Sequence, residues 1–218
     1  MRTSWWLLSL AAAAFALASC PRSAAPPSTA PAPPPSIAAP PAHEAEEPDA
    51  ASCGTERWAV KVGSDPGARQ PMATVRSTIA ELRALPRPSQ LPEGERFAGA
   101  ETTIYELRDV LLVKVKREAD SDAHLVLADD SGATMVAELA DEACVAAASP
   151  WRPAIRDARA TLAAHPLVHA NKTAAFVSLR GVGFFDRLHG QTGMAPNGIE
   201  LHPVLAICFG MGCDFGAP

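Results

Sequence analysis

Residues 102–118 read TTIYELRDVLLVKVKRE, and this stretch decides the fold class that the sequence predicts. It is long and rich in β-branched and other apolar residues, which favour a strand. Apolar residues alternate on both sides of Asp109, which interrupts the pattern at its middle. A strand of this length commonly bends at such a point, so we expect a β-bulge near Asp109 and Val110.

Four more strands and one helix are predicted after this long strand. Residues 124–128 (HLVLA) and 133–139 (ATMVAEL) predict two strands, because a turn sequence, Asp129-Asp130-Ser131-Gly132, separates them. Ser149 and Pro150 are typical of a helix start. The helix would end at His165-Pro166, and two more strands are predicted at 174–185 and 199–207. The helix would bury one apolar face, formed by Trp151, Ile155, Ala158 and Leu162.

This order of elements resembles the OB-fold, a five-stranded Greek-key barrel with a helix between strands 3 and 4. The resemblance covers residues 102–207 and implies a mainly β barrel. Upstream, residues 58–62 (WAVKV) alternate and predict a short strand or extended arm, and residues 78–81 (TIAE) fit the capping box of a short helix. We therefore expect residues 52–218 to form one OB-like globular domain with an N-terminal arm.

An export signal is predicted at residues 1–19. Arg2 precedes a 14-residue apolar run, too short to span a bilayer comfortably and typical of a signal-peptide core. The run ends in Leu17-Ala18-Ser19-Cys20, which resembles the bacterial lipobox. That resemblance implies cleavage before Cys20 and lipidation of its thiol, hence a membrane anchor on the cell envelope. The alternative is an ordinary cleaved signal in which Cys20 is incidental. Residues 181–204 are also similar to segments of exported bacterial proteins, a similarity that implies no particular activity.

Residues 20–51 predict a disordered linker. Ten of the 31 residues after Cys20 are proline and ten are alanine, so the segment cannot build a core. Proline-rich chain favours extended polyproline II at roughly 3.1 Å per residue, which would let the domain stand up to ~90 Å from a membrane. The remaining chain is nearly neutral and has no run of lysine or arginine. Nucleic acid is therefore an unlikely partner, since phosphate binding needs clustered positive charge.

Four cysteines remain after Cys20, which predicts two disulfides in an exported domain. Cys208 and Cys213 could close a small ring, which leaves Cys53 to pair with Cys144. The alternative is a metal site made of cysteines, although the sequence has no CxxC pair.

Four ionisable residues form the best candidate site: Asp186, His189, Glu200 and His202. The first two begin the loop between the last two strands, and the other two alternate on the last strand, so they share a face. Imidazole and carboxylate together suit a divalent metal such as zinc. The alternative is structural, with Asp186 capping a turn and His202 bonding to backbone. His124 could join this group or be an ordinary strand histidine.

Ligand-binding candidates are Phe184, His189, Gln191 and Asn197. One of Phe184 and Phe185 could stack on a base or sugar, but period-2 alternation sends at least one to the core. Gly181 and Gly183 predict a kink in the barrel rather than a phosphate loop.

Three functional hypotheses follow. The first is an envelope binding module for a small ligand, a glycan or a protein, which needs no cofactor. The second is a metal-dependent hydrolase, with phosphodiesters as one candidate substrate class, that uses the four-residue site with zinc or another divalent metal. The third is a structural envelope protein in which the polar residues only stabilise the hairpin.

Overall fold

The computed structural model describes residues 53–118, 121–166 and 174–215. The export signal, the lipidation site Cys20 and the linker predicted before residue 52 lie outside these described residues. None of the helices in the described ranges has the length and hydropathy that a membrane-spanning segment needs.

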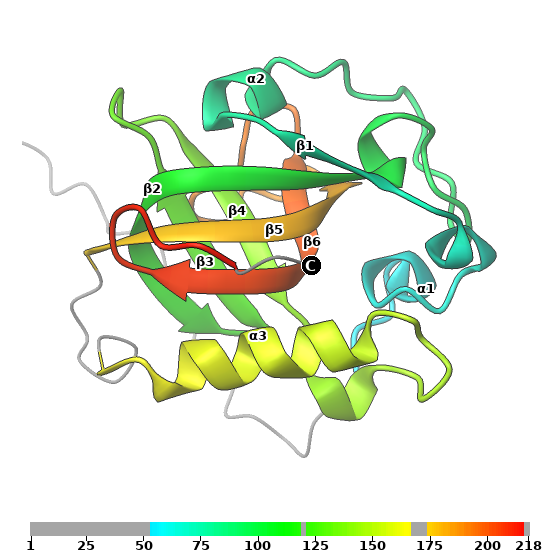
Figure 1. Ribbon diagram of the computed structural model, residues 1–218. Coiled ribbons are helices and arrows are strands. Elements are labelled where there is room, and N and C mark those ends of the chain that lie inside the picture. Colours follow the sequence, from blue (N-terminus) through cyan, green and yellow to red (C-terminus); the bar gives the residue numbers. More distant parts are fainter. Residues whose placement is uncertain (1–52, 119–120, 167–173, 216–218) are drawn as a thin grey trace, which may run out of the picture. The chain divides into compact units, whose positions relative to one another are not determined.

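Five strands close into a barrel, as the sequence predicts (Figure 1). Hydrogen bonds link β2 to β3, β3 to β4, β4 to β6, β6 to β5, and β5 back to β2. The β4–β6 pair is parallel and the other four pairs in the ring are antiparallel. The order confirms a mainly β, OB-fold-like barrel. The strands are β2 (Thr103–Arg117), β3 (Ala123–Ala128), β4 (Thr134–Leu139), β5 (Ala175–Phe185) and β6 (Ile199–Phe209).

The barrel interior is an apolar core built from alternate residues of every strand. Helix α3 (Arg152–Ala164) lies below the barrel in Figure 1, and its Ala158 and Leu162 join this core. The predicted apolar face of the helix is confirmed, because all four of its residues are buried. The intervening residues of β3, β4 and β6 point to the outer face of the barrel. Interior residues include Leu125, Leu127, Met135, Ala137, Leu179 and Leu201.

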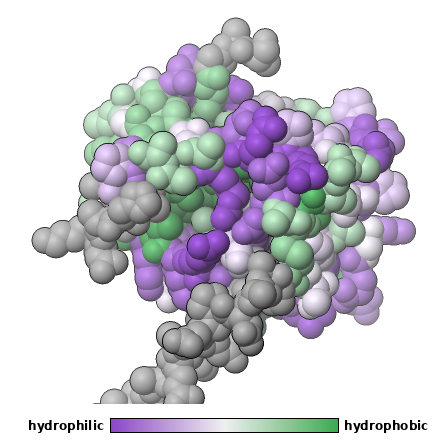
Figure 2. All heavy atoms as spheres, turned by 90° about the horizontal axis from the view of Figure 1, so that it is seen from below, coloured by the Kyte–Doolittle hydropathy of each residue, from purple (hydrophilic) through white to green (hydrophobic). Residues whose placement is uncertain are grey.

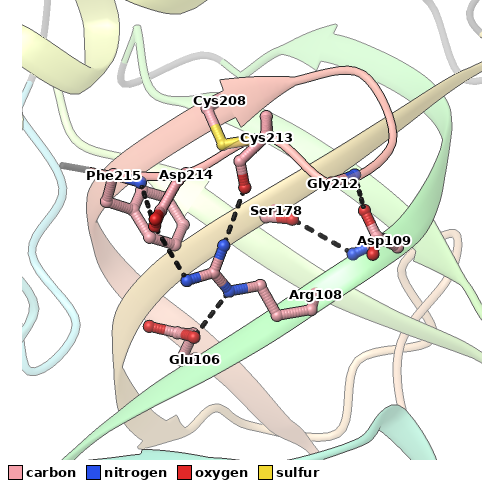
Figure 3. Close-up of a disulfide and its surroundings, with 9 residues drawn as sticks. All are labelled: Glu106, Arg108, Asp109, Ser178, Cys208, Gly212, Cys213, Asp214 and Phe215. Atoms are coloured by element: carbon pink, nitrogen blue, oxygen red, sulfur yellow. Dashed lines mark hydrogen bonds and ion pairs between the residues drawn. A yellow bond between two sulfur atoms is a disulfide. The ribbon is translucent and has the colours of Figure 1, made fainter.

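The predicted bulge in β2 is confirmed at Asp109. The register of β2 against β5 shifts between Leu107 and Val110, and Asp109 has a φ of 51°. Its Oδ1 accepts a hydrogen bond from the Gly212 N–H (2.7 Å), and its own N–H donates to Ser178 Oγ (3.1 Å; Figure 3). The bulge therefore gives the C-terminal turn its attachment to the barrel.

The predicted kink in β5 is also present. The β5–β6 register shifts on both sides of Gly181. A Cβ on Gly183 would overlap the Ala100 carbonyl oxygen, and a Cβ on Gly181 would lie 2.8 Å from Leu201 Cβ. Glycine is needed at these positions because neighbouring chain approaches β5 too closely for a side chain.

The N-terminal region differs from the sequence prediction at residues 58–62. The prediction of a strand or extended arm for this segment is wrong, because Trp58–Lys61 forms the short helix α1. Val60 and Val62 are both buried, as alternation requires, but a window of five residues does not separate one helical turn from a strand. Arg57, in the left-handed conformation, precedes the turn and accepts from the Val60 and Lys61 N–H groups.

The rest of the region packs along β2. Strand β1 (Ala73–Arg76), which the sequence pattern did not predict, pairs with β2 in parallel. Helix α2 (Ile79–Arg83) begins with the predicted capping box between Thr78 and Glu81. The 3-10 turns are η1 (Pro66–Arg69), η2 (Ala100–Thr102) and η3 (Glu142–Cys144).

Both predicted disulfides are confirmed. Cys53 bonds to Cys144 across 91 residues and ties the N-terminal segment to η3. Cys208 bonds to Cys213 and closes the turn that follows β6 (Figure 3).

Glu106 is the centre of an ion network on the outside of β2. Its carboxylate accepts from Arg108 Nε (2.6 Å) and Arg180 Nε (2.7 Å), although Glu106 is buried. Arg108 also donates to the Cys213 carbonyl (2.7 Å) and to Asp214 (3.2 Å), so the network holds the C-terminal segment (Figure 3). Burial alone would raise the pKa of Glu106, but the two guanidinium groups outweigh it and lower the pKa to about 2.

We expect the stabilisation by Glu106 to be lost in acid. A carboxylate whose pKa is lower in the folded state stabilises the fold above its unfolded pKa, near 4.3, and this contribution disappears as the pH falls toward 2. The Glu106→Gln variant should therefore melt below the wild-type protein at pH 6, and most of the gap should be lost by pH 2.5. Thermal unfolding at several pH values measures this. Asp157→Asn, at an exposed ion pair with Arg156, is the control; a Glu106→Gln gap independent of pH would contradict the assignment.

Candidate functional site

The four predicted site residues form two separate pairs. Glu200 and His202 lie on the outer face of β6, because Leu201 between them faces the barrel interior. His202 Nδ1 is 3.2 Å from Glu200 Oε1. In the loop after β5, His189 Nε2 is 2.9 Å from Asp186 Oδ2. His189 is half exposed, whereas the other three residues are buried.

The partners of His202 come from strands far away in the sequence. Its Nδ1 lies 2.9 Å from Glu138 Oε2 of β4, and its Nε2 lies 3.5 Å from Asp122 Oδ2, just before β3. Glu138 Oε1 also accepts from Nδ1 of His124, its register partner on β3 (3.0 Å). His124, an open possibility from the sequence, thus joins the group. We call Asp122, His124, Glu138, Glu200 and His202 the outer-face cluster.

Two segments cover the outer-face cluster and keep it from solvent. The loop 186–198 crosses β3 and β4, where Gln191 Nε2 donates to Glu138 Oε1 (3.2 Å) and the Thr192 carbonyl accepts from His124 Nε2 (3.1 Å). From the other side, α1 brings the Lys61 ammonium to 3.7 Å from Asp186 Oδ1 and close enough to the cluster carboxylates for their charges to raise its pKa. The face on which OB-folds commonly bind ligands is therefore occupied by the chain itself.

Burial and charge shift the protonation of the cluster in opposite directions. Burial raises the pKa of Glu200 to about 7, and the neighbouring charge of Glu138 adds to the effect. Burial alone would lower the pKa of His202, but hydrogen bonds to Glu138 and Glu200 outweigh it and raise the pKa to about 9. When no metal ion is bound, these shifts favour the protonated form of His202, which donates to both carboxylates, and they place the pKa of Glu200 near neutral pH.

His124 and Lys61 show the same balance, in which nearby carboxylates outweigh the effect of burial on the pKa. Burial opposes charge on His124, but its hydrogen bond to Glu138 raises its pKa above the ordinary value. Burial likewise opposes charge on Lys61, yet the carboxylates around it, Glu200 foremost, raise its pKa. Burial disfavours ionised Glu138, but the two histidines hold its pKa well below the usual range. The cluster is thus a buried, internally compensated ionic network.

The ligand-binding candidates have different environments. Phe184 is 0% exposed, with the Arg57 guanidinium 4.7 Å and the Lys61 ammonium 5.3 Å from its ring centroid. Phe185 lies in the barrel core, so neither ring offers a stacking surface. Asn197 donates to the Leu82 and Leu85 carbonyls at 2.9 and 3.0 Å and holds the loop to α2.

The loop 186–198 is fixed at both ends, and its exposed part, residues 187–190, directly follows Asp186. The Asp186 N–H donates to the Gly198 carbonyl (2.9 Å), and Arg87 Nη1 donates to the carbonyls of Asp186 (2.8 Å) and Asn197 (2.9 Å). Ala195 is buried. Residues 187–190 are all exposed, and Leu188 is 57% exposed.

The sequence contains a signal for Glu138, a partner of His202 that the sequence prediction did not include. Glu138 interrupts the apolar run ATMVAEL, and His124 opens the apolar run HLVLA. Two polar residues on the outer parity of consecutive strands predict a cross-strand pair, as found here. The parallel β4–β6 pairing that brings Glu138 to His202 has no local signal, since it depends on barrel closure.

The side of the domain that carries α3 offers a mixed surface. Figure 2 is viewed from below Figure 1, hence from the side of α3, and shows a band of hydrophilic residues flanked by more hydrophobic ones. No single apolar area dominates the part of this face that the described residues form.

No protein-family model and no curated protein matches the chain. Among solved structures, the chain is similar to a protein from Leishmania major Friedlin assigned as an aspartyl-tRNA synthetase, with 16% sequence identity and a TM-score of 0.35. The match covers 62% of this chain and spans only 20% of the other, and similarity at this level carries no functional argument.

Proposed function

We propose that the chain is an exported, lipid-anchored binding module of the bacterial cell envelope, and that it presents the exposed residues 187–190 of the 186–198 loop to an envelope protein. The observation that carries the proposal is the contrast within this loop. Its base is held by hydrogen bonds to the barrel and α2, while residues 187–190 stand in solvent with an exposed leucine at position 188.

The location in the envelope rests on the sequence and agrees with the disulfides. The apolar run and the lipobox-like Leu17-Ala18-Ser19-Cys20 favour export and a lipid anchor, and disulfides persist in extracytoplasmic compartments. The proline- and alanine-rich linker would let the anchored domain reach a partner up to ~90 Å away.

A protein partner suits the chemistry of residues 187–190. Leu188 lies beside Arg187, which pairs with Glu56 (2.6 Å) and Glu93 (3.2 Å), so an apolar anchor is bordered by charges of both signs. An apolar centre with a polar rim is the usual anatomy of a protein interface. The hydrolase hypothesis is less well supported, since its four proposed ligands form two pairs and three of them are buried.

Site-specific photo-crosslinking in cells tests the proposal. A photoreactive phenylalanine derivative at position 188 of the full chain should give one discrete protein adduct. The same group at Ala160, exposed on α3, should not give that adduct. Replacing Arg187 by glutamate should reduce the adduct several-fold, and Cys20→Ser should remove it together with the lipid mass.

Two results would reject the proposal. The first is the same adduct from both positions, which would mean contact by proximity alone. The second is an adduct from position 188 that is unchanged when Cys20→Ser releases the chain from the membrane.

A further inference from the structure

Three members of the outer-face cluster place ligand atoms around one point. Within the described residues, Asp122, Glu138 and His202 form the one group of three or more histidine, cysteine or acidic side chains whose ligand atoms all lie within 4.8 Å of one another. They come from the turn before β3, from β4 and from β6, so the barrel itself brings them together. All three side chains are buried.

The orientation of His202 is the second observation. Its Nε2 is buried and has no hydrogen-bond partner among the described residues. It lies 3.5 Å from Asp122 Oδ2, a distance that is longer than a good N–H···O hydrogen bond. The other carboxylate oxygen of Asp122, Oδ1, accepts a hydrogen bond from the Asp141 N–H (2.7 Å), which fixes the orientation of the carboxylate. A buried ring nitrogen thus faces a carboxylate oxygen at ion-pair distance and makes no hydrogen bond with the described residues.

The surroundings match those of a metal-bound histidine. Ligating histidines commonly use the second ring nitrogen to donate to a carboxylate, which fixes the ring. Here His202 Nδ1 lies 2.9 Å from Glu138 Oε2 and 3.2 Å from Glu200 Oε1. Two ligands bound at about 2.1 Å to one ion lie no more than ~4.2 Å apart. The three ligand atoms, which lie within 4.8 Å of one another, must therefore move closer, and Glu138 must exchange its contact with Nδ1 for the ion, which leaves Glu200 to hold Nδ1.

We propose that Asp122, Glu138 and His202 form a buried site for a divalent metal ion, with Zn²⁺ as the best match to one imidazole and two carboxylates. Glu200 is the positioning residue that orients His202. This site differs from the four-residue set expected from the sequence, because it excludes Asp186 and His189. Since the cluster is buried beneath α1 and the 186–198 loop, the ion is structural and holds β4, β6 and the β2–β3 turn together.

The test measures metal in the full chain after chelation and re-addition of ZnCl₂. Mass spectrometry should find about one equivalent of zinc, and the Tm should rise by about 5–10 °C at a zinc concentration ~100 times the Kd. The Asp122→Asn and Glu138→Gln variants should neither bind the equivalent of zinc nor show the rise in Tm. The matched controls Asp186→Asn and His189→Ala should keep both, since they remove the second acid–histidine pair.

Co²⁺ provides a readout that needs no variant. Bound to one imidazole and two carboxylates, it should give a visible absorption spectrum that Zn²⁺ abolishes. The proposal fails if the wild-type chain takes up no metal under these conditions. It also fails if folded Asp122→Asn retains the metal, or if His189→Ala loses it. The binding-module proposal is tested separately, because loss of crosslinking at position 188 does not depend on zinc content.

Discussion

Replacing Arg57 by methionine is expected to lower the free energy of unfolding by about 3–5 kcal/mol, since breaking a buried ion pair leaves an uncompensated charge. Arg57 Nη1 and Nη2 donate to the two oxygens of Glu101 at 2.8 and 2.7 Å, and both side chains are at most 1% exposed. Arg57 also donates to the Phe185 carbonyl (3.1 Å). One guanidinium thus joins the start of α1, the η2 turn and the end of β5.

Urea unfolding of the variant measures the loss. Glu101→Met should cost a similar amount, because it leaves Arg57 charged and orphans the N–H groups of Phe97 and Phe185. The double variant should cost less than the sum of the two. Arg156→Ala, at an exposed pair with Asp157, should change stability by less than ~1 kcal/mol. A loss below 1 kcal/mol for Arg57→Met would show that the pair does not stabilise the fold.

Removing the Cys53–Cys144 disulfide is expected to cost about 4–5 kcal/mol, and removing Cys208–Cys213 only about 2 kcal/mol. The difference follows from loop-closure entropy, because the first bond spans 91 residues and the second spans 5. Paired cysteine-to-alanine variants, unfolded in urea without reductant, compare the two directly. Each variant is the control for the other, since both remove two sulfur atoms. The opposite order of stabilities would mean that local contacts, rather than chain entropy, dominate.

The barrel was predictable because its signals are local. The interrupted alternation at Asp109 indicated the bulge, and the glycines at 181 and 183 indicated the kink. The spacing of Cys208 and Cys213 indicated the small ring. Each of these features depends on residues within one element, so a pattern along the chain is enough to find it.

The misses share a different cause. Residues 58–62 form a helix because Arg57 is fixed by Glu101, 44 residues away. Strand β1 has four exposed residues and therefore no alternation, and it extends only because β2 offers an unpaired edge. Two members of the outer-face cluster, Glu200 and His202, were predicted together because they share a strand. Glu138 and Asp122 were not, because they reach His202 only through barrel closure.

The position of Cys53 has a mechanical consequence for an anchored domain. If force were applied between the N-terminal tether and a partner at the 186–198 loop, the covalent load path would cross the disulfide from Cys53 to Cys144. It would then follow the backbone through α3 and β5 to Leu188. The chain between the two cysteines, including α1 and strands β1 to β4, would lie outside this covalent path. Force would reach these strands only through non-covalent contacts, such as the hydrogen bonds between β5 and β2 and those from Arg159 of α3 to the Leu139 and Ser121 carbonyls.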